Sequence, residues 1–284
     1  MSGWSEDWPA PAKLNRFLHI VGRRADGYHR LQTLFQFIDR CDSLAFAVGD
    51  DGRIELETPL LGVAPQADLS VRAAQALREA SGVTAGVRIR VVKRLPLGGG
   101  LGGGSSDAAT TLVALNHLWG CGLDVDALAG LGLGLGADVP VFVRGCAAWA
   151  EGVGELLTPV EVDEPWFVVL VPGTAVATRS VFEDPELTRD SPLITIRDFL
   201  AGACRNDCEA VVYRRFPAVA EAAGWLGNYA PTRLTGTGAC VFAAFASQDD
   251  ARRVCAALPP GWEGFVARGR NRSPLLRRLA AAQR

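Results

Sequence analysis

The sequence lacks features that mark several other classes of protein. No uninterrupted apolar run reaches the roughly 18 residues of a membrane span, because the richest stretch, residues 128–142, contains glycines and Asp138. The seven cysteines are odd in number and form no C-x-x-C pair, which argues against a zinc site or a disulfide framework. A net charge of −2 argues against nucleic acid as a partner. We therefore expect a cytoplasmic protein with neither a membrane nor nucleic acid as partner.

Two common nucleotide-binding patterns are also missing, and a third is matched by its glycine spacing alone. No Gly-Lys pair occurs, which excludes a P-loop, and neither His-Arg-Asp nor Asp-Phe-Gly marks a protein kinase. Gly98, Gly100 and Gly103 satisfy the dinucleotide pattern G-x-G-x-x-G, and Asp124 follows about 20 residues later. Residues 115–124, however, are typical of a helix end and a loop, whereas the acid of a dinucleotide site ends a strand. The match is a coincidence of a glycine-dense segment.

The most informative segment is a glycine run, with six glycines in residues 98–104, followed by the Ser-Ser-Asp of residues 105–107. Residues 87–91 before it alternate as in a half-buried strand, and apolar residues at helical spacing follow within 112–119. Serine and aspartate are accepted N-cap residues, so we expect the helix to begin at 105–107. Backbone amides without neighbouring Cβ atoms, beside a helix N-terminus, can cradle phosphate. A plain tight turn, the alternative, does not need this helix start.

Three segments then carry a resemblance to a known family. Residues 96–109 resemble the phosphate loop of the GHMP kinases, the family of galactokinase, homoserine kinase and mevalonate kinase. Residues 11–15 (Pro-Ala-Lys-Leu-Asn) resemble the N-terminal motif of that family, and residues 234–242 resemble its C-terminal glycine motif. The resemblance implies an α+β fold of two domains, ribosomal protein S5 domain 2-like and then ferredoxin-like, with the active site between them.

The pattern along the chain is compatible with α+β halves. We place the domain boundary at the acidic segment after Pro159, which gives an N-terminal domain of residues 1–159 and a C-terminal domain of residues 160–284. Residues 14–46 suggest strands formed by short apolar runs with turns between them, after a loose start at residues 1–8. Helices are predicted over 69–79, 124–133 and 249–257, and strands over 140–143, 167–171, 241–246 and 265–267.

The resemblance implies ATP as phosphoryl donor. The aliphatic stem of Lys93 then covers the adenine, whereas Asp68 stands where the family has asparagine, which leaves an adenine contact by Asp68 open. Mg²⁺ is implied by ATP chemistry, although no paired-carboxylate motif marks its ligands. The expected ATP-binding residues are Lys93, Pro96, Leu97, Gly98, Gly99, Gly100, Leu101, Gly102, Gly103, Gly104, Ser105 and Ser106.

Phosphoryl transfer also needs a cation and a group that aligns the attacking hydroxyl. Lys13 in the N-terminal motif is the candidate cation. Asp138 stands alone in an apolar segment, where an acid is either a helix-end cap or a catalytic group, and the residues alone leave both open. By resemblance, Asp138 orients the substrate hydroxyl and accepts its proton, with Lys13 as its electrostatic partner.

Further segments point to one branch of the family. Residues 22–29, 31–36, 136–140 and 151–154 resemble the branch that acts on a small cytidine diphosphate alcohol. The alternatives are a family kinase for another small alcohol and an inactive nucleotide-binding regulator. We expect a monomer or a weak dimer. By resemblance, Tyr28, His29 and Phe182 hold the cytosine ring, and Asn15 and Thr178 contact the rest of the substrate.

Overall fold

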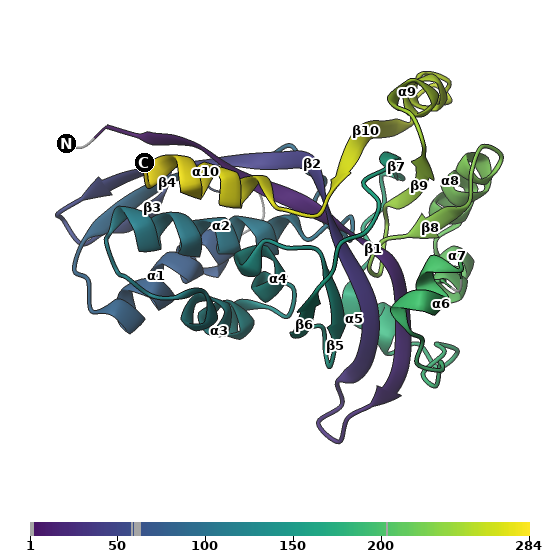
Figure 1. Ribbon diagram of the computed structural model, residues 1–284, viewed down its shortest axis with the longest axis horizontal. Coiled ribbons are helices and arrows are strands. Elements are labelled where there is room, and N and C mark those ends of the chain that lie inside the picture. Colours follow the sequence, from purple (N-terminus) through teal and green to yellow (C-terminus); the bar gives the residue numbers. More distant parts are fainter. Residues whose placement is uncertain (1–2, 58, 60–63, 203) are drawn as a thin grey trace.

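The computed structural model describes residues 3–57, 59, 64–202 and 204–284, which form two α+β halves joined through one sheet (Figure 1). The strands are β1 (Ser5–Arg23), β2 (His29–Gly49), β3 (Ile54–Leu56), β4 (Gly86–Val92), β5 (Ala148–Glu151), β6 (Leu156–Pro159), β7 (Trp166–Val171), β8 (Thr232–Leu234), β9 (Val241–Phe245) and β10 (Glu263–Arg270). The helices are α1 (Leu69–Ser81), α2 (Gly103–Leu118), α3 (Val125–Leu135), α4 (Val139–Arg144), α5 (Thr178–Phe182), α6 (Ile196–Leu200), α7 (Glu209–Arg215), α8 (Pro217–Gly227), α9 (Gln248–Ala256) and α10 (Pro274–Ala282), with a 3₁₀ turn at Pro65–Ala67.

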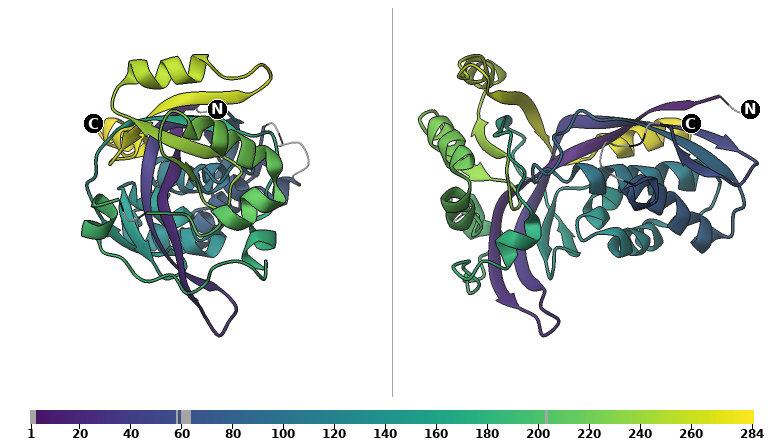
Figure 2. Two further views of the ribbon diagram at one scale, coloured as in Figure 1. Left: turned by 90° about the vertical axis from the view of Figure 1, so that its right-hand side faces the viewer. Right: turned by 180° about the vertical axis from the view of Figure 1, so that it is seen from behind.

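Two long antiparallel strands, β1 and β2, run through both halves of the molecule (Figures 1 and 2). Along its length β2 pairs with β5 at 33–35, with β10 at 37–38 and with β4 at 43–49. The expected short strands with turns between them are therefore wrong. Irregularities in the β1–β2 register bend the pair without ending it, which is how bulges redirect a strand.

Helices α1 to α4 pack on the sheet of the first half, and the C-terminal helix α10 joins them (Figure 1). The chain returns there through backbone hydrogen bonds from Ala147 N to Asn271 O and from Ser273 N to Gly145 O. Leu275 of α10 is buried in the same core as α2. The last residues thus lie with the first half of the chain, while the boundary after Pro159 stays a prediction.

The second half has the order β10-β7-β9-β8, with α7 and α8 between β7 and β8 and with α9 between β9 and β10. This β-α-β-β-α-β pattern with antiparallel neighbours is the ferredoxin-like arrangement. Its core is separate from that of the first half, and the α+β architecture expected from the sequence is confirmed.

Two local expectations are corrected. Residues 140–143, predicted as a strand, lie in helix α4, which has a proline in its first turn and ends at Gly145 with a left-handed φ of 65°. Helix α2 begins at Gly103 rather than at 105–107, because Gly102 takes a left-handed φ of 74° and lets the chain enter the helix earlier. Among the described residues, no helix is long and apolar enough to cross a membrane.

Candidate active site

The three motifs found in the sequence meet around the glycine loop. Lys13 N in β1 donates a hydrogen bond to Leu101 O (3.0 Å), and Cys240 N donates to Gly99 O (3.1 Å). The Thr235 hydroxyl donates to Gly100 O at 3.2 Å. Strand β1, the loop and the C-terminal glycine motif are therefore held together at the junction of the two halves.

The loop needs glycine at this junction because other atoms come very close. A Cβ on Gly100, whose φ is +75°, would lie 2.1 Å from Thr235 O. A Cβ on Gly102 would lie 2.8 Å from Cζ of Phe142 and 3.3 Å from Cε of Lys13. Real Cβ atoms do not approach as closely as 2.1 or 2.8 Å, so glycine at both positions lets the loop pass between Lys13 and the C-terminal motif.

Lys13 and Asp138 lie together at this point, as the sequence predicts. The Lys13 ammonium lies 3.5 Å from Asp138 Oδ2, and it donates to Asn15 Oδ1 at 2.6 Å and to Gly100 O at 3.1 Å. The ammonium is buried and lies 5.3 Å from the centre of the Phe35 ring. Every neighbour therefore favours a positive charge fixed beside the glycine loop.

Asp138 occupies the N-cap position of α4, but its side chain makes no capping hydrogen bond. The carboxylate is 35 % exposed, while the Lys13 side chain is 4 % exposed. The cap alternative is thereby removed, and Asp138 is left as an accessible carboxylate beside a buried cation. Such a group can accept a hydrogen bond from a bound hydroxyl.

Lys93 lies in a second, deeper cluster at the base of the loop. Its ammonium contacts Asp42 and lies 2.7 Å from Asp107 Oδ2. The other oxygen of Asp42 accepts from the backbone N–H groups of Arg94 (2.5 Å) and Leu95 (2.8 Å), just before the glycine run. This cluster ties β2, the entry to the loop and the first turns of α2 together. The adenine contact of Lys93 stays a prediction.

In the Lys93 cluster, burial and neighbouring charges act in opposite directions on the pKa values of Asp107 and Lys93. Burial raises the pKa of Asp107 to about 7, opposed by Lys93 and assisted by Asp42 and Asp68. Burial by itself lowers the pKa of Lys93, but Asp107 and Asp42 outweigh it and leave that pKa raised. One oxygen of Asp107 is buried with no partner among the described residues. Asp68 accepts from Ser70 N at 2.8 Å and caps α1.

The predicted base-binding residues come together at the far end of the β1–β2 pair. The rings of His29 and Phe182 stack with centroids 5.1 Å apart and planes 25° apart, although they are far apart in sequence. Tyr28 projects beside them with 65 % of its surface exposed. Thr178, at the start of α5, lies 3.0 Å from the Thr237 hydroxyl, oxygen to oxygen. The structure thus brings His29 and Phe182 together, with Tyr28 next to His29 in the chain and Thr178 in the same short helix as Phe182.

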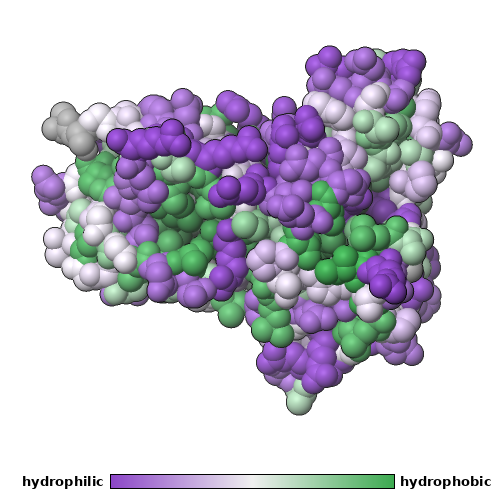
Figure 3. Space-filling model, viewed as in Figure 1, coloured by the Kyte–Doolittle hydropathy of each residue, from purple (hydrophilic) through white to green (hydrophobic). Residues whose placement is uncertain are grey.

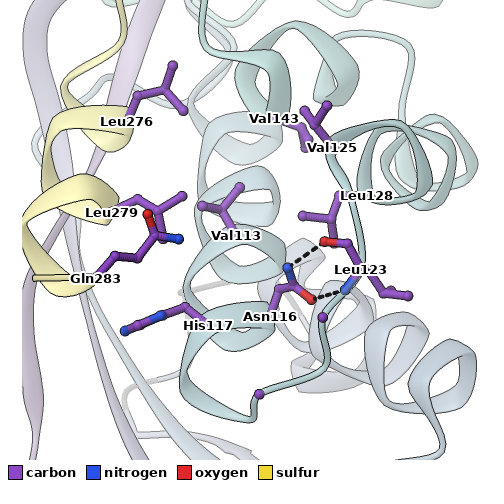
Figure 4. Close-up of a pocket in the computed structure, with 12 residues that line it drawn as sticks. Val113, Asn116, His117, Leu123, Val125, Leu128, Val143, Leu276, Leu279 and Gln283 are labelled. Atoms are coloured by element: carbon purple, nitrogen blue, oxygen red, sulfur yellow. Dashed lines mark hydrogen bonds between the residues drawn. The ribbon is translucent and has the colours of Figure 1, made fainter.

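A separate cavity of about 480 Å³ lies between α2, α3, α4 and α10 and contains none of the predicted site residues. Figure 3 shows apolar side chains gathered in the hollow between α10 and α3. In the close-up of Figure 4, Val113, Leu128 and Leu279 line it, and Asn116 bonds both backbone groups of Leu123. Its polar lining is already satisfied at Asn116, and we assign it no part in the chemistry.

Sequence reasoning missed three residues of the site. Asp42 lies inside a long strand with no motif around it, and nothing local indicates that β2 carries it to the end of β4. Thr235 is part of the C-terminal motif, which was the available signal. Arg189 lies in a loop after α5 and contacts His29, a pairing that sequence spacing does not suggest.

This fold, with a glycine loop between a Lys–Asp pair and a C-terminal glycine motif, defines a class of small-molecule kinases. The chain belongs to the GHMP kinase family. The profile of the GHMP kinase N-terminal domain matches residues 68–146, and that of the C-terminal domain matches residues 187–262.

Within the family, the similar proteins point to one activity. The 4-diphosphocytidyl-2-C-methyl-D-erythritol kinase of Ectopseudomonas mendocina (strain ymp) is 61 % identical over 96 % of this chain and 94 % of that protein. The kinase of the same name from Halorhodospira halophila (strain DSM 244 / SL1) is 57 % identical over 100 % of this chain and 99 % of its own. A crystal structure of 4-(cytidine 5'-diphospho)-2C-methyl-D-erythritol kinase aligns at a TM-score of 0.79 with 36 % identity, covering 92 % of this chain and 98 % of that one.

Proposed function

We propose that this protein transfers the γ-phosphoryl group of ATP to the 2-hydroxyl of 4-diphosphocytidyl-2-C-methyl-D-erythritol. The products are the 2-phosphate and ADP, in the non-mevalonate route to isoprenoid precursors. The observation that carries the proposal is the Lys13–Asp138 pair, 3.5 Å apart beside the glycine loop. Relatives of that name, about 60 % identical over nearly the full chain, supply the substrate.

In this proposal the loop residues 98–106 hold the phosphates with backbone amides and the start of α2. The Asp138 carboxylate orients the attacking hydroxyl and takes its proton, while the Lys13 ammonium lies 3.5 Å from it and provides the neighbouring positive charge. Asn15 fixes the ammonium by accepting its hydrogen bond. In a loose transition state, this alignment contributes more than early removal of the proton.

Magnesium, when bound with ATP, supplies charge neutralisation at the phosphates. Among the residues the structure describes, no group of three or more His, Cys, Asp or Glu side chains is arranged to hold a metal ion. Mg²⁺ does not require such a group, because it usually keeps several waters and binds through one or two carboxylates together with substrate phosphates.

Tyr28, His29 and Phe182 are proposed to hold the cytosine ring, because stacked and projecting rings suit a flat base. Asn15 and Thr178 are proposed to contact the rest of the substrate. We also propose a location in the reducing cytoplasm, since all seven cysteines are free thiols.

The test is a coupled ADP-release assay with Mg-ATP and two alcohols, the cytidylated one and 2-C-methyl-D-erythritol 4-phosphate, which lacks the cytidylyl group. We expect turnover with the cytidylated alcohol only. Equal turnover with both alcohols would contradict the base site, and ATP binding without turnover on either would contradict the kinase activity toward this substrate.

A further inference from the structure

The loop after α5 contains an arginine that the proposed chemistry does not use. Nε of Arg189 lies 3.1 Å from Nε2 of His29 and donates to it. Nη1 donates to Leu187 O at 3.0 Å, and Nη2 donates to Phe182 O at 2.9 Å and to Asp184 O at 2.7 Å. Each nitrogen of the guanidinium is thus engaged. No ion pair of Arg189 with a carboxylate is found among the described residues, so its place is set by these four contacts.

These contacts join the two rings of the proposed base site. His29 begins β2 at the tip of the β1–β2 hairpin, and Phe182 ends α5 in the other half of the chain. Arg189 holds the His29 ring directly and Phe182 through its carbonyl group, so one side chain fixes both members of the stack. The planar guanidinium of arginine has donors in fixed directions and can bond both groups at once, whereas the ammonium of lysine sits on a flexible chain and cannot hold both in place.

The contact also determines where His29 carries its proton. A guanidinium has only donors, so Nε2 of His29 must be the acceptor and must carry no hydrogen. Burial lowers the pKa of His29, and the charges of Arg189 and Arg23 lower it further, which keeps the ring neutral. A neutral imidazole with a bare Nε2 has its hydrogen on Nδ1, and no described hydrogen bond occupies that nitrogen.

We propose that Arg189 is a positioning residue of the base-binding site: it holds His29 in the neutral Nδ1–H form and in register with Phe182, so that a hydrogen-bond donor faces an acceptor of the substrate base. The proposal rests on the proposed function for the identity of the base. It assigns Arg189 no contact with the reacting atoms. A pyrimidine with a ring nitrogen or carbonyl acceptor on its edge fits such a donor.

The variant Arg189→Lys tests this, because it keeps the charge and removes the fork. We expect KM for the cytidylated alcohol to rise about tenfold, the effect of one lost hydrogen bond of about 1.4 kcal/mol, with kcat and the KM for ATP unchanged. The matched control is Arg179→Lys on α5, where the arginine is exposed and, among the described residues, pairs with Glu183 alone. The control should behave as wild type.

The second readout is the ¹⁵N spectrum of the histidine side chains in the free protein, which has three histidines. In the wild type we expect His29 to be neutral at pH 7, with Nε2 unprotonated. In Arg189→Lys we expect a mixture of the two neutral forms. A wild-type His29 with hydrogen on Nε2, or an unchanged spectrum and KM in the variant, would overturn the proposal.

The two readouts separate this inference from the proposed function. If the wild type does not turn over the cytidylated alcohol, the proposed function fails and the assignment of Arg189 to a base site fails with it. The spectrum needs no substrate, so it still decides whether Arg189 sets the His29 tautomer. Turnover in the wild type with no KM effect in Arg189→Lys leaves the function standing and overturns the positioning role.

Discussion

The chain has two lysines, and both place their ammonium groups against carboxylates beside the same glycine loop. Lys13 faces one carboxylate, that of Asp138, which is 35 % exposed and 3.5 Å away. Lys93 faces two, those of Asp42 and Asp107, which are 0 % and 5 % exposed and in closer contact. The two sites differ in exposure: a substrate can reach the carboxylate of Asp138, whereas the carboxylates of Asp42 and Asp107 are buried.

The two lysines therefore have different roles, the first in the chemistry and the second in the stability of the fold. The Lys13–Asp138 pair is accessible to solvent at Asp138, and its two charges are 3.5 Å apart. A carboxylate that must bind a substrate hydroxyl during the reaction needs this accessibility. The Lys93 cluster closes the base of the loop by joining β2, the loop entry and α2. Changes to the first pair should therefore affect turnover, and changes to the second should affect stability.

The largest expected effect comes from Asp138→Asn. The amide keeps the shape but has no negative charge to hold the substrate hydroxyl in line and to take its proton, so kcat should fall on the order of 10³-fold while ATP still binds. The measurement is ADP release together with equilibrium binding of ATP. Asp126→Asn, which alters an exposed pair with Arg144, is the matched control. Near-wild-type turnover in Asp138→Asn would show that this carboxylate does no chemistry.

The next largest effect is expected for Asp42→Ala, which should lower the free energy of unfolding. The change leaves the N–H groups of Arg94 and Leu95 without their acceptor and removes one partner of Lys93. The free energy of unfolding should fall by about 3 kcal/mol, the usual cost of breaking a buried charged pair. Urea denaturation measures it. The exposed pair of Glu57 with Arg90 provides the control, and Glu57→Ala should change little. Equal urea midpoints for both variants would show that Asp42 does not stabilise the base of the glycine loop.

The smallest effect is a dependence on pH in Asp107→Asn. The pKa of Asp107 is about 7 in the folded protein against 3.8 as the ordinary value. Between pH 3.8 and pH 7 the folded state keeps a proton on Asp107 that the unfolded state has lost. The free energy of unfolding of the wild type therefore falls as the pH rises through this range, and the fall is complete above pH 7. The variant, neutral throughout, should gain stability over wild type between pH 5 and pH 8, on the order of 2 kcal/mol.

Thermal or urea unfolding of both proteins at pH 5 and pH 8 measures this difference, in which the other titrating groups cancel. A difference in stability that is the same at both pH values would contradict the raised pKa of Asp107.

What the sequence predicted well was local. The glycine loop can be recognised within a few residues, because six glycines before a Ser-Ser-Asp helix start suit a phosphate cradle. Lys13 and Asp138 were singled out through the resemblance to the family, and their roles stay predictions. The helix over 69–79 and the strand over 167–171 follow from spacing alone, and α1 and β7 confirm them.

What the sequence did not predict depends on contacts between distant segments. The short apolar run 140–143 is compatible with a strand or a buried helix, and packing against α2 and α3 decides for a helix. Asp42 reaches Lys93 only because β2 passes beside β4 in one register. Arg189 meets His29 only because the β1–β2 hairpin extends into the second half.

The most direct test of the account compares Lys13→Met with Lys93→Met, which remove the same charge from the two sites. Turnover and the urea midpoint are measured for both variants. We expect Lys13→Met to lose turnover with the smaller fall in the urea midpoint, and Lys93→Met to show the larger fall and to retain turnover while folded. If Lys93→Met loses turnover at unchanged stability and Lys13→Met remains active, the assignment of the chemistry to the Lys13–Asp138 pair is wrong.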